Sequence, residues 1–217
     1  MGSAFAAHGH QHNHNLKGYM LIVSRRNGFI FGLATLLSFS PNTFAQSTTQ
    51  DLGSKPDPNS LKRLQPYLDS PRLVGQSNFS YWGFDVYHAS LWVGVNAFKA
   101  EQWQIQRLAL ELRYLRDFDG KAIAQRSLDE IQAQNALPKN KAQAWLSTLE
   151  NLFPNVRKGQ SLTGIYLPDM GAHFLIDNAR LGEIKDPELA KRFFDIWLAK
   201  QTSAPELRKK LIADTQN

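Results

Sequence analysis

The strongest constraint on the fold is a stretch in which apolar side chains alternate with mostly polar ones. Between Arg107 and Arg116 the apolar positions alternate with the others: Leu108, Leu110, Leu112 and Tyr114 against Arg107, Ala109, Glu111 and Arg113. A period of two gives a β-strand one apolar and one polar face. Such a strand is typical of an antiparallel sheet that packs one face on a core and leaves the other wetter.

The other predicted elements fall into blocks. Residues 73–95 are rich in aromatic and β-branched side chains, which favours two or three paired strands, and residues 161–167 and 173–176 predict a hairpin. Helices are expected after Asp119, over 142–153, after Asp186 and from Ser203. Strands and helices that are segregated in this way predict an α+β fold, an antiparallel β-sheet packed against a layer of helices.

The first 45 residues are predicted to include a targeting segment that is not part of the fold. From Met20 the chain has two arginines, then the apolar run 29–39, then Thr43 and Ala45 at the positions that precede a signal-peptidase cut. This apolar run is well short of the roughly 20 residues that span a bilayer. We therefore expect a signal peptide cleaved near Ala45, a periplasmic or secreted protein, and no stable membrane anchor.

Two further segments are expected to lie outside the fold. Residues 1–19 hold four histidines at alternate positions, which indicates a tag or a misassigned start ahead of Met20. Residues 46–60 are rich in Pro, Gly and Ser and predict a flexible leader. The remaining residues, 61–217, are expected to form one domain.

The charge of the chain at first suggests a nucleic-acid partner. The formal net charge is +6, but residues 1–45 contain three basic and no acidic side chains, so cleavage would leave +3. No run of five like charges remains after residue 45, so no nucleic-acid partner is expected. The absence of cysteine excludes disulfides, cysteine-ligated metals and a lipidated cysteine. Nothing in the sequence assigns an oligomeric state.

Known catalytic patterns are missing from the predicted domain. Only His88 and His173 lie beyond the predicted signal peptide, and neither has a second ligand at metal-binding spacing. Nucleophile-elbow, dinucleotide and phosphate-loop patterns are absent. We therefore expect neither a metal nor a cofactor.

A basic and aromatic set of side chains remains. Arg126 lies on the helix predicted after Asp119, beside its apolar stripe and one turn before Glu130. A cation next to apolar surface suits a ligand with a carboxylate and an apolar tail, whereas an ordinary i,i+4 surface pair with Glu130 explains it equally well. The aromatic members of the set are Tyr81, Trp82, Tyr87, Trp92 and Tyr114. Most of them are expected in the core.

Several segments together resemble the bacterial chalcone isomerase-like family. They are Val74-Gly75, Gly83–Trp92, Leu110–Tyr114, Ile123–Ser127, Leu162–Tyr166 and Phe193–Leu198. The resemblance covers about residues 70–213. It implies the chalcone isomerase fold, with a ligand cleft between the sheet and the helices.

The resemblance also implies where binding residues lie. The threonine, tyrosine, asparagine and later hydroxyl residue of the plant enzymes correspond to Trp82, Ile123, Glu130 and Ile196, so the proton-transfer network of chalcone cyclisation is missing. A basic residue of the same helix corresponds to Arg126. Relatives with this fold in plastids bind fatty acids through an arginine and a tyrosine, and Arg72 is a loose candidate for that arginine.

Three hypotheses follow. The first is a binder without chemistry for a fatty acid or phenolic compound, with the ligand-binding residues Trp82, Arg113, Ile123, Arg126, Glu130 and Ile196. The alternative is an isomerase, an intramolecular lyase acting on a chalcone-like enone, with Tyr81, Tyr87 or Glu130 as acid-base group. The third is an interaction module whose cleft is filled by its own side chains.

Overall fold

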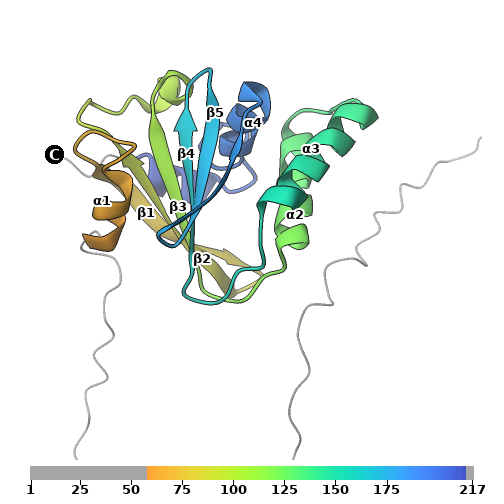
Figure 1. The fold of residues 1–217 in the computed structure, drawn as a ribbon, viewed down its shortest axis with the longest axis horizontal. Helices are drawn as coiled ribbons and strands as arrows, with labels where there is room; N and C mark the ends of the chain where they lie inside the picture. The colour runs from red at the N-terminus through yellow and green to blue at the C-terminus, as the bar shows by residue number, and fades with distance from the viewer. Residues whose placement is uncertain (1–57, 214–217) are drawn as a thin grey trace, which may run out of the picture. The chain divides into compact units, whose positions relative to one another are not determined.

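A six-stranded antiparallel sheet forms the centre of the part of the chain that the computed structural model describes, residues 58–213. The predicted tag and signal peptide and most of the predicted leader lie outside these residues. The strands lie side by side in chain order: β1 (Arg72–Tyr81), β2 (Phe84–Val93), β3 (Leu108–Tyr114), β4 (Ser161–Leu167), β5 (Gly171–Ile176) and β6 (Ala179–Ile184). The predicted α+β class is confirmed (Figure 1).

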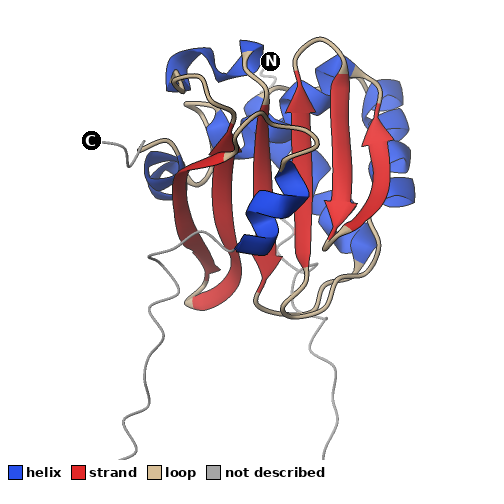
Figure 2. Ribbon diagram, turned by 60° about the vertical axis from the view of Figure 1, so that its left-hand side comes forward, coloured by secondary structure: helices blue, strands red, loops and turns tan. Residues whose placement is uncertain are grey.

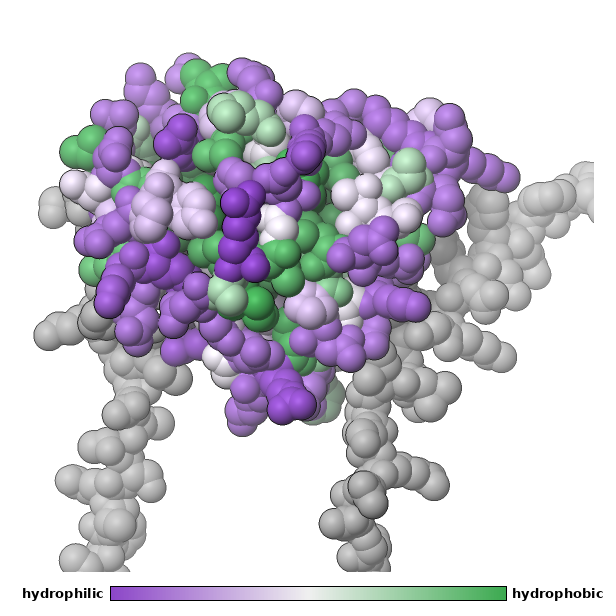
Figure 3. All heavy atoms as spheres, in the orientation of Figure 1, coloured by the Kyte–Doolittle hydropathy of each residue, from purple (hydrophilic) through white to green (hydrophobic). Residues whose placement is uncertain are grey.

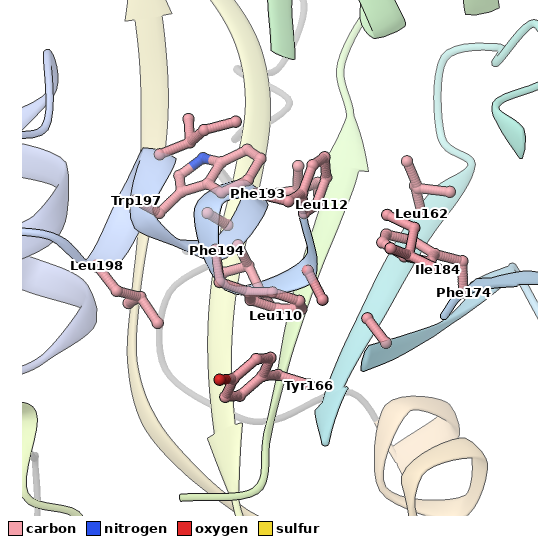
Figure 4. Packing of buried hydrophobic residues seen from close by; sticks show 14 of the residues in the cluster. Leu110, Leu112, Leu162, Tyr166, Phe174, Ile184, Phe193, Phe194, Trp197 and Leu198 are labelled. Carbon is pink, nitrogen blue, oxygen red and sulfur yellow. The ribbon is translucent and has the colours of Figure 1, made fainter. Parts of the chain in front are cut away.

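The main core lies between one face of the sheet and a group of helices: α2 (Gly120–Gln134), α3 (Lys139–Leu152), α4 (Pro187–Leu198) and α5 (Pro205–Leu211). Helix α4 packs against β4, β5 and β6, and α5 packs against β1 and β2. The apolar alternation of β3 supplies Leu108, Leu110 and Leu112 to this core. Figure 4 shows Phe193 and Phe194 of α4 beside Leu112 and Leu110 of β3.

The opposite face of the sheet is covered as well, which the sequence did not predict. Helix α1 (Pro58–Leu64) lies on it (Figure 2). Leu64 and the following Leu68 form a second apolar cluster with Trp92, Ala109, Ile165 and Leu175. The face that we expected to be more solvent-exposed is therefore largely buried here, and the residues that the structure describes begin at residue 58, inside the predicted leader. A short 3₁₀ helix, η2 (Ala100–Ile105), and β6 were not predicted either.

A two-residue turn of unusual composition joins β1 and β2. Tyr81 pairs with Phe84, and both residues between them have positive φ, 52° at Trp82 and 78° at Gly83. This is the signature of the type I′ turn, which favours Asn or Gly because a left-handed backbone is strained in a bulky residue.

We expect Trp82→Asn to raise the free energy of unfolding by about 1 kcal/mol, because asparagine tolerates this backbone conformation. Urea unfolding followed by circular dichroism measures the change. Trp82→Ala is the matched control, since it removes the ring and keeps the strain. An equal gain for both variants would show that the ring, and not the backbone, is unfavourable.

Candidate functional site

An arginine–carboxylate pair, Arg126 with Glu130, lies at the rim of the helix layer, on the middle turns of α2. This helix begins after Asp119, whose carboxylate accepts hydrogen bonds from the backbone N–H groups of Lys121 and Ala122 at 2.9 and 3.2 Å. Two turns on, the Arg126 guanidinium donates a hydrogen bond to the Glu130 carboxylate. The same guanidinium lies 5.8 Å from the ring centroid of Tyr81, on the end of β1. The pair therefore links α2 to the β1–β2 hairpin.

The two members of the pair differ in burial. The Arg126 side chain is 49% exposed, whereas that of Glu130 is 10% exposed. The second carboxylate oxygen of Glu130 accepts a hydrogen bond of 2.8 Å from the Ser203 hydroxyl, which precedes α5. The i,i+4 pair that the sequence allowed is thus present, but its acidic member is fixed below the surface and its guanidinium reaches solvent.

A tyrosine with a perturbed hydroxyl lies beside this pair. The Tyr87 hydroxyl, on β2, accepts a hydrogen bond of 2.9 Å from the indole N–H of Trp197 on α4. Burial raises the pKa of Tyr87 well above its usual range; the Trp197 hydrogen bond lowers it, the Glu130 charge raises it and the Arg126 charge lowers it. The hydroxyl therefore stays protonated at physiological pH, and it is a poor source of a phenolate base.

Aromatic rings continue from Tyr87 toward the start of α2. Phe79 stacks on Tyr87 at 5.1 Å between ring centroids, Tyr87 meets Tyr114 at 6.0 Å, and Tyr114 meets Phe118 at 5.4 Å. Ile123, one turn before Arg126, is half-buried against the same core. The structure therefore brings Arg126, Glu130, Tyr81, Tyr87 and Ile123 together in one region, which we call the Arg126 site.

Three other residues singled out in the sequence lie elsewhere, and the side-chain alternation of a strand explains one of them. Arg113 lies on the opposite face of β3 from Leu112 and Tyr114, opposite His88 of β2. Burial and the Arg113 charge both lower the pKa of this His88, while Glu111 raises it. The expectation that Arg113 shares a cleft with Arg126 is therefore wrong.

Trp82 and Arg72 do not line a cleft between the sheet and the helices either. Trp82 is 83% exposed at the turn of the hairpin, so the expectation that it lines an apolar pocket is wrong here. Arg72 lies at the far end of β1, where its guanidinium donates a hydrogen bond of 3.4 Å to the Asn96 carbonyl oxygen. Ile196, by contrast, is 8% exposed within the core of α4.

Side chains fill the layer between α4 and the sheet. The ring centroids of Phe193 lie 5.3 Å from those of Phe174 and Trp197, and Phe194 lies 5.3 Å from Tyr166. Figure 3 shows mainly hydrophilic residues on the face drawn there, with hydrophobic residues showing through in its middle. The packing is that of a core and not of an open cavity.

A hollow of about 410 Å³ lies at the other end of β2 from the Arg126 site. Its lining residues are Leu68, Asp69, Val93, Gly94, Val95, Asn96, Ile105, Gln106 and Arg107. Among residues 58–213, no three histidine, aspartate or glutamate side chains are grouped as a metal site. Two contacts of the Arg126 site, those made by Trp197 and Ser203, could not be predicted from the sequence. They depend on how α4 and α5 pack against α2 and β2.

Comparisons with known proteins agree with this architecture. A family model described as chalcone isomerase-like matches residues 72–213. A Haemophilus influenzae protein described only as uncharacterized is 25% identical over 144 residues, which cover 66% of this chain and 69% of that protein. The crystal structure of an Arabidopsis thaliana fatty-acid binding protein aligns with a TM-score of 0.50 and 12% identity, over 66% of this chain and 87% of that one. At this identity the likeness concerns the fold alone.

Proposed function

The chain belongs to the chalcone isomerase-like family, and from this premise we propose that it binds a small amphipathic carboxylate, such as a fatty acid, without converting it. We place the ligand at the Arg126 site, and the protein in the periplasm or outside the cell. The solved Arabidopsis structure of the same fold is that of a fatty-acid binding protein, which supports this class of ligand.

One observation carries the proposal: a guanidinium that already holds a carboxylate is still half exposed. Arg126 uses one of its N–H groups on Glu130, and a guanidinium has five donors arranged in a fork that matches a carboxylate. The outer edge of Arg126 can therefore hold a ligand carboxylate. Ile123 and the ring of Tyr81 lie next to it and offer apolar surface to the first part of the tail.

Arg126→Ala is expected to weaken laurate binding about tenfold, because a charge-assisted hydrogen bond on a half-exposed group is worth roughly 1.4 kcal/mol. Isothermal titration calorimetry of the variant and the parent chain measures the change. Arg180→Ala is the matched control, since Arg180 is likewise an exposed arginine bonded to a nearby glutamate, Glu183, but on β6. Equal affinity of the Arg126→Ala variant and the parent would remove Arg126 from this role.

Glu130→Gln is expected to tighten laurate binding severalfold. The amide keeps an acceptor for Arg126 and a partner for Ser203 while removing a negative charge that repels the ligand carboxylate. The same titration measures the effect. Weaker binding by the amide variant would mean that the glutamate charge is needed to position the guanidinium.

The alternative, an isomerase acting on a chalcone-like enone, makes a different prediction for the same variants. If Glu130, Tyr81 or Tyr87 moved a proton, the chain would speed the loss of chalcone absorbance above the spontaneous rate. Replacing the responsible residue, by Glu130→Gln, Tyr81→Phe or Tyr87→Phe, would then return the rate to the spontaneous one. A binder gives the spontaneous rate for the parent chain and for each variant.

A further inference from the structure

The turn of the β1–β2 hairpin concentrates exposed aromatic surface. Tyr81, Trp82 and Phe84 are 50%, 83% and 59% exposed, and we call these three side chains the aromatic tip. The described residues have six large hydrophobic side chains that are exposed, and the other three are Val95, Ile105 and Met170. Three of these six side chains therefore fall within four consecutive residues, 81–84, which is unusual for a soluble surface unless something binds there.

The backbone conformation at the tip indicates that Trp82 does not stabilise the fold. Trp82 has a φ of 52°, which is strained for a bulky side chain, and its ring is largely free of packing. A residue that costs stability in the turn and gains little burial in return has a use outside the fold.

Arginines lie against the flanking rings of the tip. The Arg116 guanidinium is 4.8 Å from the ring centroid of Phe84, and that of Arg126 is 5.8 Å from the ring centroid of Tyr81. The carboxylate next to the tip, Asp85, accepts a hydrogen bond of 2.5 Å from the Ser80 hydroxyl. Asp117 accepts one of 2.7 Å from the backbone N–H of Lys158. The cations thus stand directly beside the aromatic surface, and both carboxylates have partners.

We propose that the aromatic tip inserts into the headgroup layer of an anionic lipid bilayer. Tryptophan and tyrosine favour this layer because their rings are apolar and their N–H or O–H groups still reach water. Arg116 and Arg126 are placed to contact lipid phosphates, to which guanidinium groups bind in a fork. The proposed contact is a peripheral one, made by the side chains of the tip. None of the helices within residues 58–213 is long and apolar enough to cross a membrane.

The proposal shares Arg126 and Tyr81 with the proposed ligand site, so its test is built on Trp82, which that site does not use. The five tryptophans of the chain make the test measurable. Trp92, Trp103, Trp145 and Trp197 are all buried, with at most 7% exposure, which leaves Trp82 as the one exposed indole. Quenching of tryptophan fluorescence by a brominated lipid therefore reports whether Trp82 enters the bilayer.

The test uses the full chain and vesicles of equal parts phosphatidylcholine and phosphatidylglycerol. The parent chain is expected to sediment with these vesicles, to bind pure phosphatidylcholine more weakly, and to be quenched by brominated phosphatidylcholine. Trp82→Asn is expected to bind about tenfold more weakly while unfolding at a higher temperature than the parent, so that loss of fold is not the cause. Trp82→Phe, which keeps an aromatic ring, is expected to retain most of the binding.

Two results would overturn the proposal. Equal sedimentation of the Trp82→Asn variant and the parent would show that the tip is not used on membranes. Analytical ultracentrifugation provides the other test: if the parent is a dimer and Trp82→Asn a monomer, and neither binds vesicles, then the tip contacts a second copy of the chain and not lipid.

Discussion

Arg63→Ala is expected to lower the free energy of unfolding by about 3–5 kcal/mol, because it leaves a buried carboxylate without its cation. The Arg63 guanidinium, on α1, donates a hydrogen bond of 2.6 Å to Glu111 of β3, and their side chains are 7% and 9% exposed. The same guanidinium donates one of 3.1 Å to the Ser60 hydroxyl. Removing it would therefore strand Glu111 beneath α1.

Two further variants separate this effect from a general loss of α1. Lys62→Ala, at the exposed neighbouring position, is expected to change the free energy of unfolding by less than about 0.5 kcal/mol. The double variant Arg63→Met, Glu111→Met is expected to recover most of the loss, since a buried ion pair can be replaced by apolar side chains. Urea unfolding measures all three. A loss below about 1 kcal/mol for Arg63→Ala would mean that Glu111 reaches water without α1.

Phe194→Ala is expected to cost about 3–5 kcal/mol, because it opens a cavity in the layer between α4 and the sheet. Phe194 is fully buried, and its ring lies against Gly164 of β4, where an added Cβ would come within 3.0 Å of Cζ. Phe194→Leu is the control and is expected to cost about 1 kcal/mol, since it keeps most of the volume.

The same comparison tests whether this layer is a core or a space held open for a ligand. If it were an open cleft, Phe194→Ala would cost little more than Phe194→Leu, because few contacts would be lost. Thermal unfolding of the two variants beside the parent gives the answer. The filled layer is also why we place the ligand at the rim of α2.

Local sequence patterns predicted those features that depend only on residues near one another in the chain. Asp119 and Asp186 were expected to begin helices, and both carboxylates accept backbone hydrogen bonds from the first turn. The alternation in β3 correctly predicted a strand and its apolar face. The same alternation predicts that Arg113 lies on the other face of β3, because odd-numbered residues of this strand cannot share a face with Leu112. Including Arg113 among the ligand-binding residues disregarded this alternation.

Long-range packing explains what the sequence did not reveal. Helix α1 is short and begins in a segment of turn-forming composition, and it is stabilised by contacts with residues far along the chain, such as Arg63 with Glu111. Tryptophan is not a typical turn residue. The correspondence of Trp82 to the threonine of the plant enzymes implied a place in the cleft, whereas the structure has Trp82 in a two-residue turn with Gly83. The Ser203–Glu130 hydrogen bond depends on the position of α5, which no local spacing defines.

The most direct test of the central claim, that a carboxylate ligand binds at the Arg126 site, is photocrosslinking. A fatty acid with a diazirine in the chain close to its carboxylate is irradiated with the full chain, and the modified peptides are identified by mass spectrometry. The account predicts adducts on the first half of α2 and on the β1–β2 hairpin, which excess laurate suppresses and Arg126→Ala reduces. Adducts confined to the hollow between Leu68 and Arg107, or adducts that laurate does not suppress, would contradict it.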